Sequence, residues 1–154
     1  MSEAEPTEVL FYHLERAPLE RVLPQLLEKT LERGWRAVVQ ASTPERLDAL
    51  DTLLWTYRDE SFLPHGTARE GDAERQPVFL TTTDENPNDA NIRFLVDGAV
   101  AADLESYLRA IYLFDGRDAE AVEQARAQWT SAKDAGLAVT YWQQNERGAW
   151  EKKA

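Results

Sequence analysis

The 154-residue sequence contains no cysteine, which excludes disulfides, thiolate metal sites and cysteine nucleophiles. It contains no run of about 18 apolar residues, so we expect no membrane-spanning segment. Residues 1–6 are acidic and polar and lack the basic and apolar regions of a signal peptide. A chain of this composition fits a reducing compartment, and we expect it in the cytoplasm.

The motifs that hold nucleotides are missing too. No G-x-G-x-x-G is present, which removes the dinucleotide fingerprint. Gly66 and Gly71 have the spacing of a phosphate-binding loop, but Asp72 stands where that loop requires lysine. The two histidines, His13 and His65, lie far apart in the sequence, so a metal site built on both is not expected. We therefore predict no cofactor, no metal and no catalytic residue.

Positive charge is scarce. The sequence has 17 Lys and Arg against 28 Asp and Glu, a formal net charge of −11. Such a balance argues against a general nucleic-acid binder, because affinity for nucleic acid comes mostly from neutralising phosphates. A local basic patch could still bind an acidic partner, but such a patch must be found residue by residue.

Strand and helix patterns alternate along the chain. Apolar residues recur every three or four positions between Leu19 and Leu31, as in an amphipathic helix, and Ser42 with Glu45 fits a capping box before a second helix. The predicted strands are 8–14, 35–41, 77–81, 92–96, 108–114 and 137–142, with further helices at 101–106 and 118–135. This order indicates parallel α/β layers. We expect one domain over 1–154, with an ordered core at about 8–142 and a polar tail at 143–154.

One stretch carries a specific family signature. LDTLLW at 50–55 is followed by ESFLPH at 60–65, a helix end and then a turn. With FYHL at 11–14, RGWRAVV at 33–39 and ARAQW at 125–129, the chain resembles the chi subunit of bacterial DNA polymerase III. The resemblance implies a single-domain, three-layer Rossmann-like α/β fold with a mostly parallel central sheet, lacking nucleotide-binding loops. It also implies a non-catalytic replisome adaptor that links the clamp loader, through the psi subunit, to the acidic C-terminal tail of single-stranded DNA-binding protein.

The resemblance places the tail site on the last long helix. An acidic tail that ends in an apolar residue needs a basic group beside an apolar surface. In the family, a basic residue at the Arg126 position and an aromatic near Trp129 form the pocket, whereas Val122 stands where the family can carry a further basic residue. Core packing of Trp129 is the alternative on the spacing alone. The expected tail-binding residues are Val122, Arg126, Trp129, Lys133 and Leu137.

A second surface is expected around the LDTLLW and ESFLPH block. The resemblance implies contact there with the psi subunit or an accessory helicase, and aromatic side chains dominate such interfaces. Packing in the core is again the alternative for the aromatics. The expected residues are Trp55, Phe62, Leu63, Pro64 and His65.

A function from another class stays open. The same layers could form a degenerate nucleotide-binding or hydrolase-like α/β enzyme, with its ligand at the carboxyl ends of the strands. We expect no direct nucleic-acid partner and no membrane partner.

Overall fold

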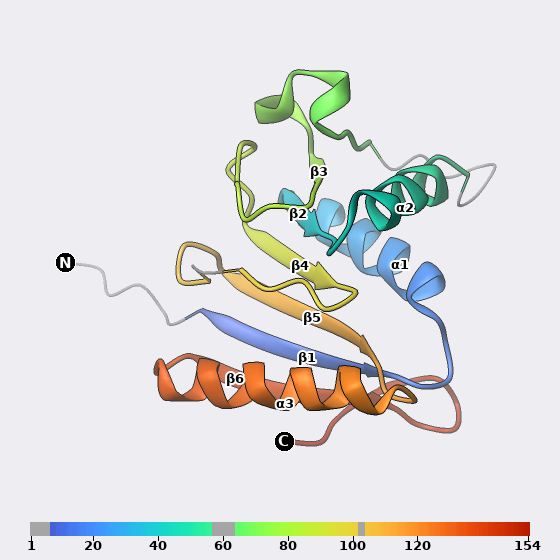
Figure 1. Cartoon of the computed structure of the whole chain (residues 1–154), viewed down its shortest axis with the longest axis vertical. Helices are drawn as coiled ribbons and strands as arrows, with labels where there is room; N and C mark the ends of the chain where they lie inside the picture. Colours follow the sequence, from blue (N-terminus) through green and yellow to red (C-terminus); the bar gives the residue numbers. More distant parts are fainter. Residues whose placement is uncertain (1–6, 57–63, 102–103) are drawn as a thin grey trace.

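A computed structural model of the chain describes residues 7–56, 64–101 and 104–154. Strands and helices alternate through most of this range (Figure 1). The strands are β1 (Glu8–Leu14), β2 (Ala37–Gln40), β3 (Val78–Thr81), β4 (Ile92–Val96), β5 (Arg109–Asp115), β6 (Ala138–Gln144) and β7 (Trp150–Lys152). The helices are α1 (Leu19–Glu32), α2 (Pro44–Thr56) and α3 (Ala119–Asp134), with single 3-10 turns η1 (Ala68–Glu70) and η2 (Ala73–Arg75).

The strands of this part of the chain form one sheet in the order β3-β2-β4-β5-β1-β6-β7. Neighbouring strands are parallel except β6 and β7, which pair antiparallel. Every residue of β2, β3 and β4 is buried, as expected for parallel strands covered on both faces. The prediction of a three-layer α/β fold with a mostly parallel sheet is confirmed.

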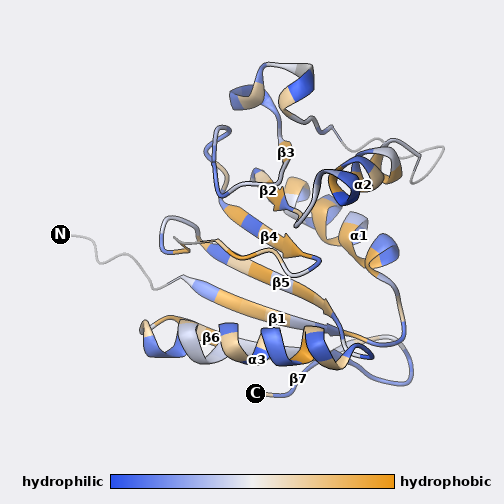
Figure 2. Ribbon diagram, viewed as in Figure 1, coloured by the Kyte–Doolittle hydropathy of each residue, from blue (hydrophilic) through white to orange (hydrophobic). Residues whose placement is uncertain are grey.

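Side-chain alternation along β1 explains the layers. Leu10 and Leu14 belong to one apolar core with α1 and α2, whereas Val9 and Phe11 belong to a second core with α3. Figure 2 shows the resulting pattern, with hydrophobic strands through the centre and helices that are hydrophilic on their outer sides. The two helix layers therefore bury opposite faces of one sheet.

The helices leave part of each face of the sheet uncovered. On the first face, α1 contacts β5 and α2 contacts β3, while on the second face α3 contacts β5, β1 and β6. On the second face, Arg93 of β4 is fully buried beneath the connections that precede and follow this strand. Its guanidinium donates to the side chains of Gln40 and Tyr107 and to the backbone oxygens of Thr83 and Glu85. A hydrogen-bonded cation thus takes the place of a covering helix there.

Three local predictions need correction. The helix expected at 101–106 is not formed by its described residues; Tyr107 N donates instead to Leu104 O at 3.2 Å, which closes a turn. Six residues are too few for a helix to be stable without extensive packing. The second helix is capped by Thr43, whose Oγ1 accepts from Arg46 N at 3.2 Å, rather than by Ser42.

The third correction concerns the tail. We expected the ordered core to end at about 142, with a polar tail after it, but β6 continues to Gln144 and the chain turns back as β7. Asn145 N donates to Ala149 O, and Gly148 supplies the positive φ of 80° that this turn requires. Trp150 packs against the first core, so an aromatic side chain holds this segment in place.

Candidate protein-binding surfaces

Helix α3 is fixed at both ends by local chemistry. Asp118 precedes it, and its Oδ1 accepts a hydrogen bond from Glu120 N at 3.1 Å, so it caps the amino end. Gly136 follows it with φ +83°, a backbone conformation that favours glycine. Ala125 and Ala132 form the buried ridge of the helix, seven residues apart. Two flanks of the helix border this ridge.

The first flank carries four of the five predicted tail-binding residues. Val122 and Trp129 are half-buried against the second core, whereas Arg126 and Lys133 are exposed. Their spacing of four, three and four places them in one stripe. We call these four residues the Arg126 flank. It offers cations beside a partly covered indole, so Trp129 combines core packing with exposure.

Two residues that the sequence did not single out hold Trp129 in place. Its ring meets Phe11 of β1 edge-on at 5.5 Å between centroids and Tyr141 of β6 at 6.0 Å. Both are aromatic residues of predicted strands, but only the pairing of β6 with β1 brings them under one helix. The sequence contains no signal for that adjacency.

Tyr141 connects the Arg126 flank to a series of hydrogen-bonded side chains. Burial raises the pKa of the Tyr141 phenol, and the nearby positive charge of Arg126 opposes that rise. The hydroxyl lies 2.5 Å from His13 Nδ1, and His13 Nε2 lies 2.9 Å from Glu15 Oε1. The hydrogen bond from His13 lowers the pKa of Glu15. His13 therefore belongs to the support of this site.

Leu137, the fifth predicted residue, lies in a different environment. It lines a cavity of about 280 Å³ with Leu104, Tyr112, Gln128 and Ser131, which is on the second flank of α3. A neighbouring apolar cavity of about 300 Å³ also opens on that flank. The structure therefore does not place Leu137 with the Arg126 flank.

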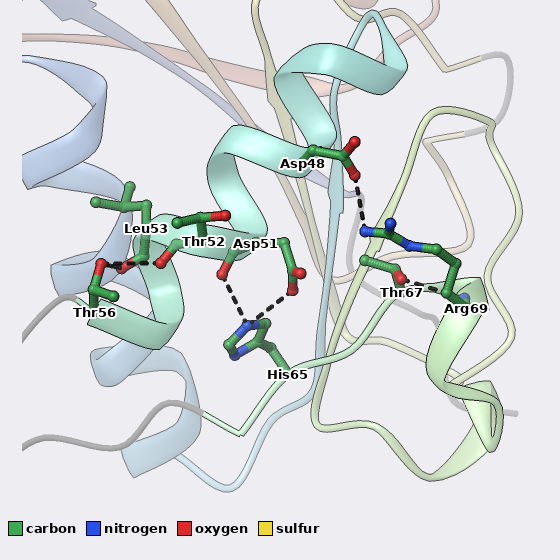
Figure 3. Close-up of polar contacts among 8 residues, drawn as sticks. All are labelled: Asp48, Asp51, Thr52, Leu53, Thr56, His65, Thr67 and Arg69. Atoms are coloured by element: carbon green, nitrogen blue, oxygen red, sulfur yellow. Dashed lines mark hydrogen bonds and ion pairs between the residues drawn. The ribbon is translucent and has the colours of Figure 1, made fainter.

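The second predicted surface includes the end of α2, where Figure 3 shows His65 beside Asp51. Trp55 is 53% exposed, and its ring lies 4.7 Å from the ring of His65. The His65 side chain is fully buried, and its Nε2 lies 3.1 Å from Asp51 Oδ1 and 3.3 Å from Asp51 O. Nε2 hydrogen-bonds the backbone oxygen of Asp51, whereas Asp51 Oδ1 has no hydrogen-bond partner among the described residues. His65 therefore supports Trp55 and cannot itself contact a partner.

The rest of this surface is only partly described. Pro64 is half-buried beside His65. Phe62 and Leu63 lie outside the described residues. Among the described residues of this predicted surface, Trp55 is the exposed one.

A crevice of about 260 Å³ lies where a nucleotide-binding relative of this fold would hold its ligand, at the carboxyl ends of β1 and β5. Pro18, which has no N–H group, precedes α1, and Glu20 adds negative charge to the first turn. Arg46 is already paired with Asp97 at 2.8 Å and with Glu20 at 3.5 Å, and the hydrogen bond with Asp97 raises its pKa. This crevice does not suit a phosphate group.

Two further features bear on the class of protein. Among residues 7–56, 64–101 and 104–154, no three metal-ligating side chains gather in one place. Over the same residues, no helix has the length and apolar character needed to cross a membrane.

The fold and these surfaces define a three-layer α/β protein of Rossmann-like arrangement that presents exposed aromatic and cationic side chains. Residues 7–140 match the family described as DNA polymerase III chi subunit, HolC. The chain therefore belongs to the family of DNA polymerase III chi subunits, which are accessory subunits of a replicative polymerase.

One curated relative is the "Probable DNA polymerase III subunit chi" of Rickettsia prowazekii (strain Madrid E). It is 26% identical over 85 residues, which are 55% of this chain and 52% of the relative. The match thus spans about half the length of that relative.

Proposed function

We propose that this protein is a non-catalytic adaptor of the bacterial replisome, acting in the cytoplasm. It binds the acidic C-terminal tail of single-stranded DNA-binding protein through the Arg126 flank. It binds a second partner, the psi subunit of the clamp loader or an accessory helicase, through the surface at Trp55. Family membership supports the replication role, and the two exposed aromatic surfaces support the adaptor role.

The observation that carries the tail site is the pairing of Arg126 with Trp129. Arg126 is exposed and close enough to oppose the burial-driven rise in the pKa of Tyr141. Trp129 is held by Phe11 and Tyr141, so it presents a fixed apolar edge next to that cation. A terminal carboxylate can accept charge-assisted hydrogen bonds from the guanidinium while the last apolar side chain packs on the indole.

The test is a titration of the full chain with a peptide of the acidic tail. Arg126→Glu should weaken binding at least tenfold, because hydrogen bonds to charged groups contribute about 1.5–3 kcal/mol. Trp129→Tyr should retain binding, since it keeps a ring between the same neighbours. Affinity should fall as salt rises.

The matched control is Arg21→Glu, which makes the same change of charge at an exposed position near the start of α1. A peptide whose terminal carboxylate is amidated should bind as weakly as the unmodified peptide binds to Arg126→Glu. Equal affinity of the wild type and Arg126→Glu for the free tail would show that the tail binds elsewhere.

The two surfaces can be separated by cross-testing. Trp55→Ala should weaken binding of the psi subunit or the helicase, because the indole is exposed at the end of α2 and rests on a fully buried His65. The same variant should bind the tail peptide normally, and Arg126→Glu should show the reverse pattern. Loss of both partners in either single variant would contradict two separate surfaces.

A further inference from the structure

On the first face of the sheet, Leu10 and Leu14 of β1 pack in the core with α1, whereas the aromatic side chains beyond them, toward β6 and β7, are only half-buried. Four aromatic residues project from this region and from the connection after α1: Tyr12, Trp35, Trp142 and Trp150. Four cations accompany them: Lys29, Arg33, Arg109 and Lys152. We call these eight residues the aromatic–basic surface. It lies on the opposite face of the sheet from the Arg126 flank.

Strand pairing sets the aromatic part of this surface. Tyr12 pairs with Trp142 on the neighbouring strand, with ring centroids 6.2 Å apart, and its ring lies 4.6 Å from that of Trp150. All four aromatic residues are half-buried, so each keeps part of its ring accessible. They line two adjoining concavities of about 250 and 870 Å³, which share Trp35 and Arg109. The four rings thus line one continuous, open surface.

The cations lie against these rings. The guanidinium carbons of Arg33 and Arg109 lie 5.1 and 5.4 Å from the ring centroid of Trp35. Lys152 pairs across the strands with Trp142, and Lys29 lies one helical turn before Arg33. Arg109 has one loose ion pair, 3.9 Å from Glu8. In the described parts of the chain, no carboxylate lies within 4 Å of the other three cations.

Three cations without an ion pair within 4 Å among the described residues lie on one surface of a chain whose net charge is −11. Structural ion pairs do not account for Lys29, Arg33 and Lys152. Positive charge at Lys29 and Arg33 also suits the carboxyl end of α1, but Lys152 has no such place. Together the three cations offer a site for an anion that comes from outside the chain. The adjoining rings limit which anion this can be.

We propose that the aromatic–basic surface binds single-stranded nucleic acid. Aromatic rings and guanidinium planes stack on unpaired bases, and flanking cations pair with the phosphates of the same strand. A duplex hides its bases and would use only the cations, and an acidic peptide would leave most of the exposed rings without a function. The inference does not rest on the tail site, which uses other residues on the other face.

The global charge limits the strength of this binding. Net negative charge repels a polyanion at a distance, so the affinity should stay in the range of non-specific binding, with Kd of about 10⁻⁴–10⁻⁶ M. Three or four phosphate contacts give a slope of about −2 to −3 for log K against log salt concentration on a single strand. Binding should therefore be clear at low salt and weak at physiological salt.

The test uses the full chain and a fluorescently labelled oligothymidylate of about 15 nucleotides, at about 20 mM salt. Arg33→Glu combined with Lys152→Glu should weaken binding at least tenfold. The matched control, Arg21→Glu combined with Arg75→Glu, changes the net charge equally at exposed positions and should change binding less than about threefold. Trp150→Ala should weaken binding about fivefold or more, since each stacked base contributes about 1–3 kcal/mol, and Trp55→Ala should not.

Several results would overturn the proposal. These are no saturable binding at low salt, an equal loss in the patch and control variants, and stronger binding of a polyglutamate peptide that also depends on Arg33 and Lys152. The last result would assign the surface to an acidic protein instead. Failure here is distinct from failure of the tail site, because Arg126→Glu should leave oligothymidylate binding unchanged and the Arg33 and Lys152 variant should leave tail binding unchanged.

Discussion

Replacing Gly116 with alanine should destabilise the protein through a single contact. Gly116 follows β5 and lies directly against the imidazole of His13. A Cβ atom built on it would lie 1.9 Å from His13 Nε2 and 2.1 Å from Cδ2. Its φ lies outside the left-handed region, so steric overlap rather than backbone strain accounts for the cost. The imidazole must therefore move, and it is 12% exposed and bound on two sides.

The size of the destabilisation follows from the overlap with His13 and from the hydrogen bonds that His13 loses when it moves. Overpacking of a filled site costs about 1–3 kcal/mol. Loss of the half-buried hydrogen bond to Tyr141 adds about 0.5–1.5 kcal/mol. The contact with the exposed Glu15 carboxylate adds little. We expect a loss of about 2–4 kcal/mol in the free energy of unfolding, which lowers Tm by about 5–15 °C at this chain length.

The assay is urea denaturation of the four proteins of a double-mutant cycle, namely the wild type, Gly116→Ala, His13→Ala and the variant with both changes. In a His13→Ala background the obstructing ring is gone, so Gly116→Ala should cost less than about 0.5 kcal/mol and can even stabilise by restricting the unfolded chain. Gly34→Ala is the comparison for backbone strain alone, because a Cβ at Gly34 meets no atom within 4 Å but its φ is +77°. If Gly116→Ala costs the same in both backgrounds, the clash with His13 is not the cause.

Other predictions concern burial and capping. Arg93→Met should lower the free energy of unfolding by about 3 kcal/mol or more in urea denaturation, because it leaves several buried acceptors without a donor. The exposed control Arg21→Met should change it by less than about 0.5 kcal/mol. Equal effects of the two variants would contradict the role of the buried network. Burial raises the pKa of Tyr112 to about 12, so its stabilising contribution of about 2–3 kcal/mol is complete below pH 10 and is lost as pH rises from 10 to 12. Absorbance titration should show a tyrosine that ionises near pH 12 and that Tyr112→Phe removes, and an unchanged titration would refute the assignment. Asp118→Ala should lower the free energy of unfolding by about 1 kcal/mol, and Asp118→Asn should lower it much less, because asparagine can still accept the hydrogen bond from Glu120 N. Equal effects of the two variants in urea denaturation would show that this cap contributes nothing.

The sequence predicts those elements best whose signals are local. The strands at 8–14 and 92–96 agree with β1 and β4 to the residue, and Gly34 and Gly136 mark where α1 and α3 end. These features depend on periodicity, on turn chemistry and on the φ that glycine permits. The short helix at 101–106 is wrong over its described residues, where Tyr107 N and Leu104 O close a turn, because local pattern cannot distinguish such a turn from a helical one.

The candidate sites are predictable only as far as they lie on one element. Spacing on α3 places Arg126 and Trp129 together, because helix geometry fixes residues three and four apart. The same spacing cannot show that Leu137 turns to the other flank, that His65 is buried against Asp51, or that Phe11 supports the indole. Those facts depend on strand order, and the order β5-β1-β6 is not encoded in any one segment.

The parts of the sheet that no helix covers show why the net charge of a chain does not identify its binding partners. On the second face, Arg93 is enclosed by neutral acceptors and all its hydrogen-bonding groups are occupied, so its charge is structural. On the first face, Arg33 and Lys152 come from segments more than a hundred residues apart, and no carboxylate of the described residues lies within 4 Å of either. A count of charges treats these three cations alike. The fold buries Arg93 and places Arg33 and Lys152 on the aromatic–basic surface. A local site for an anion can therefore exist on a chain whose total charge argues against it.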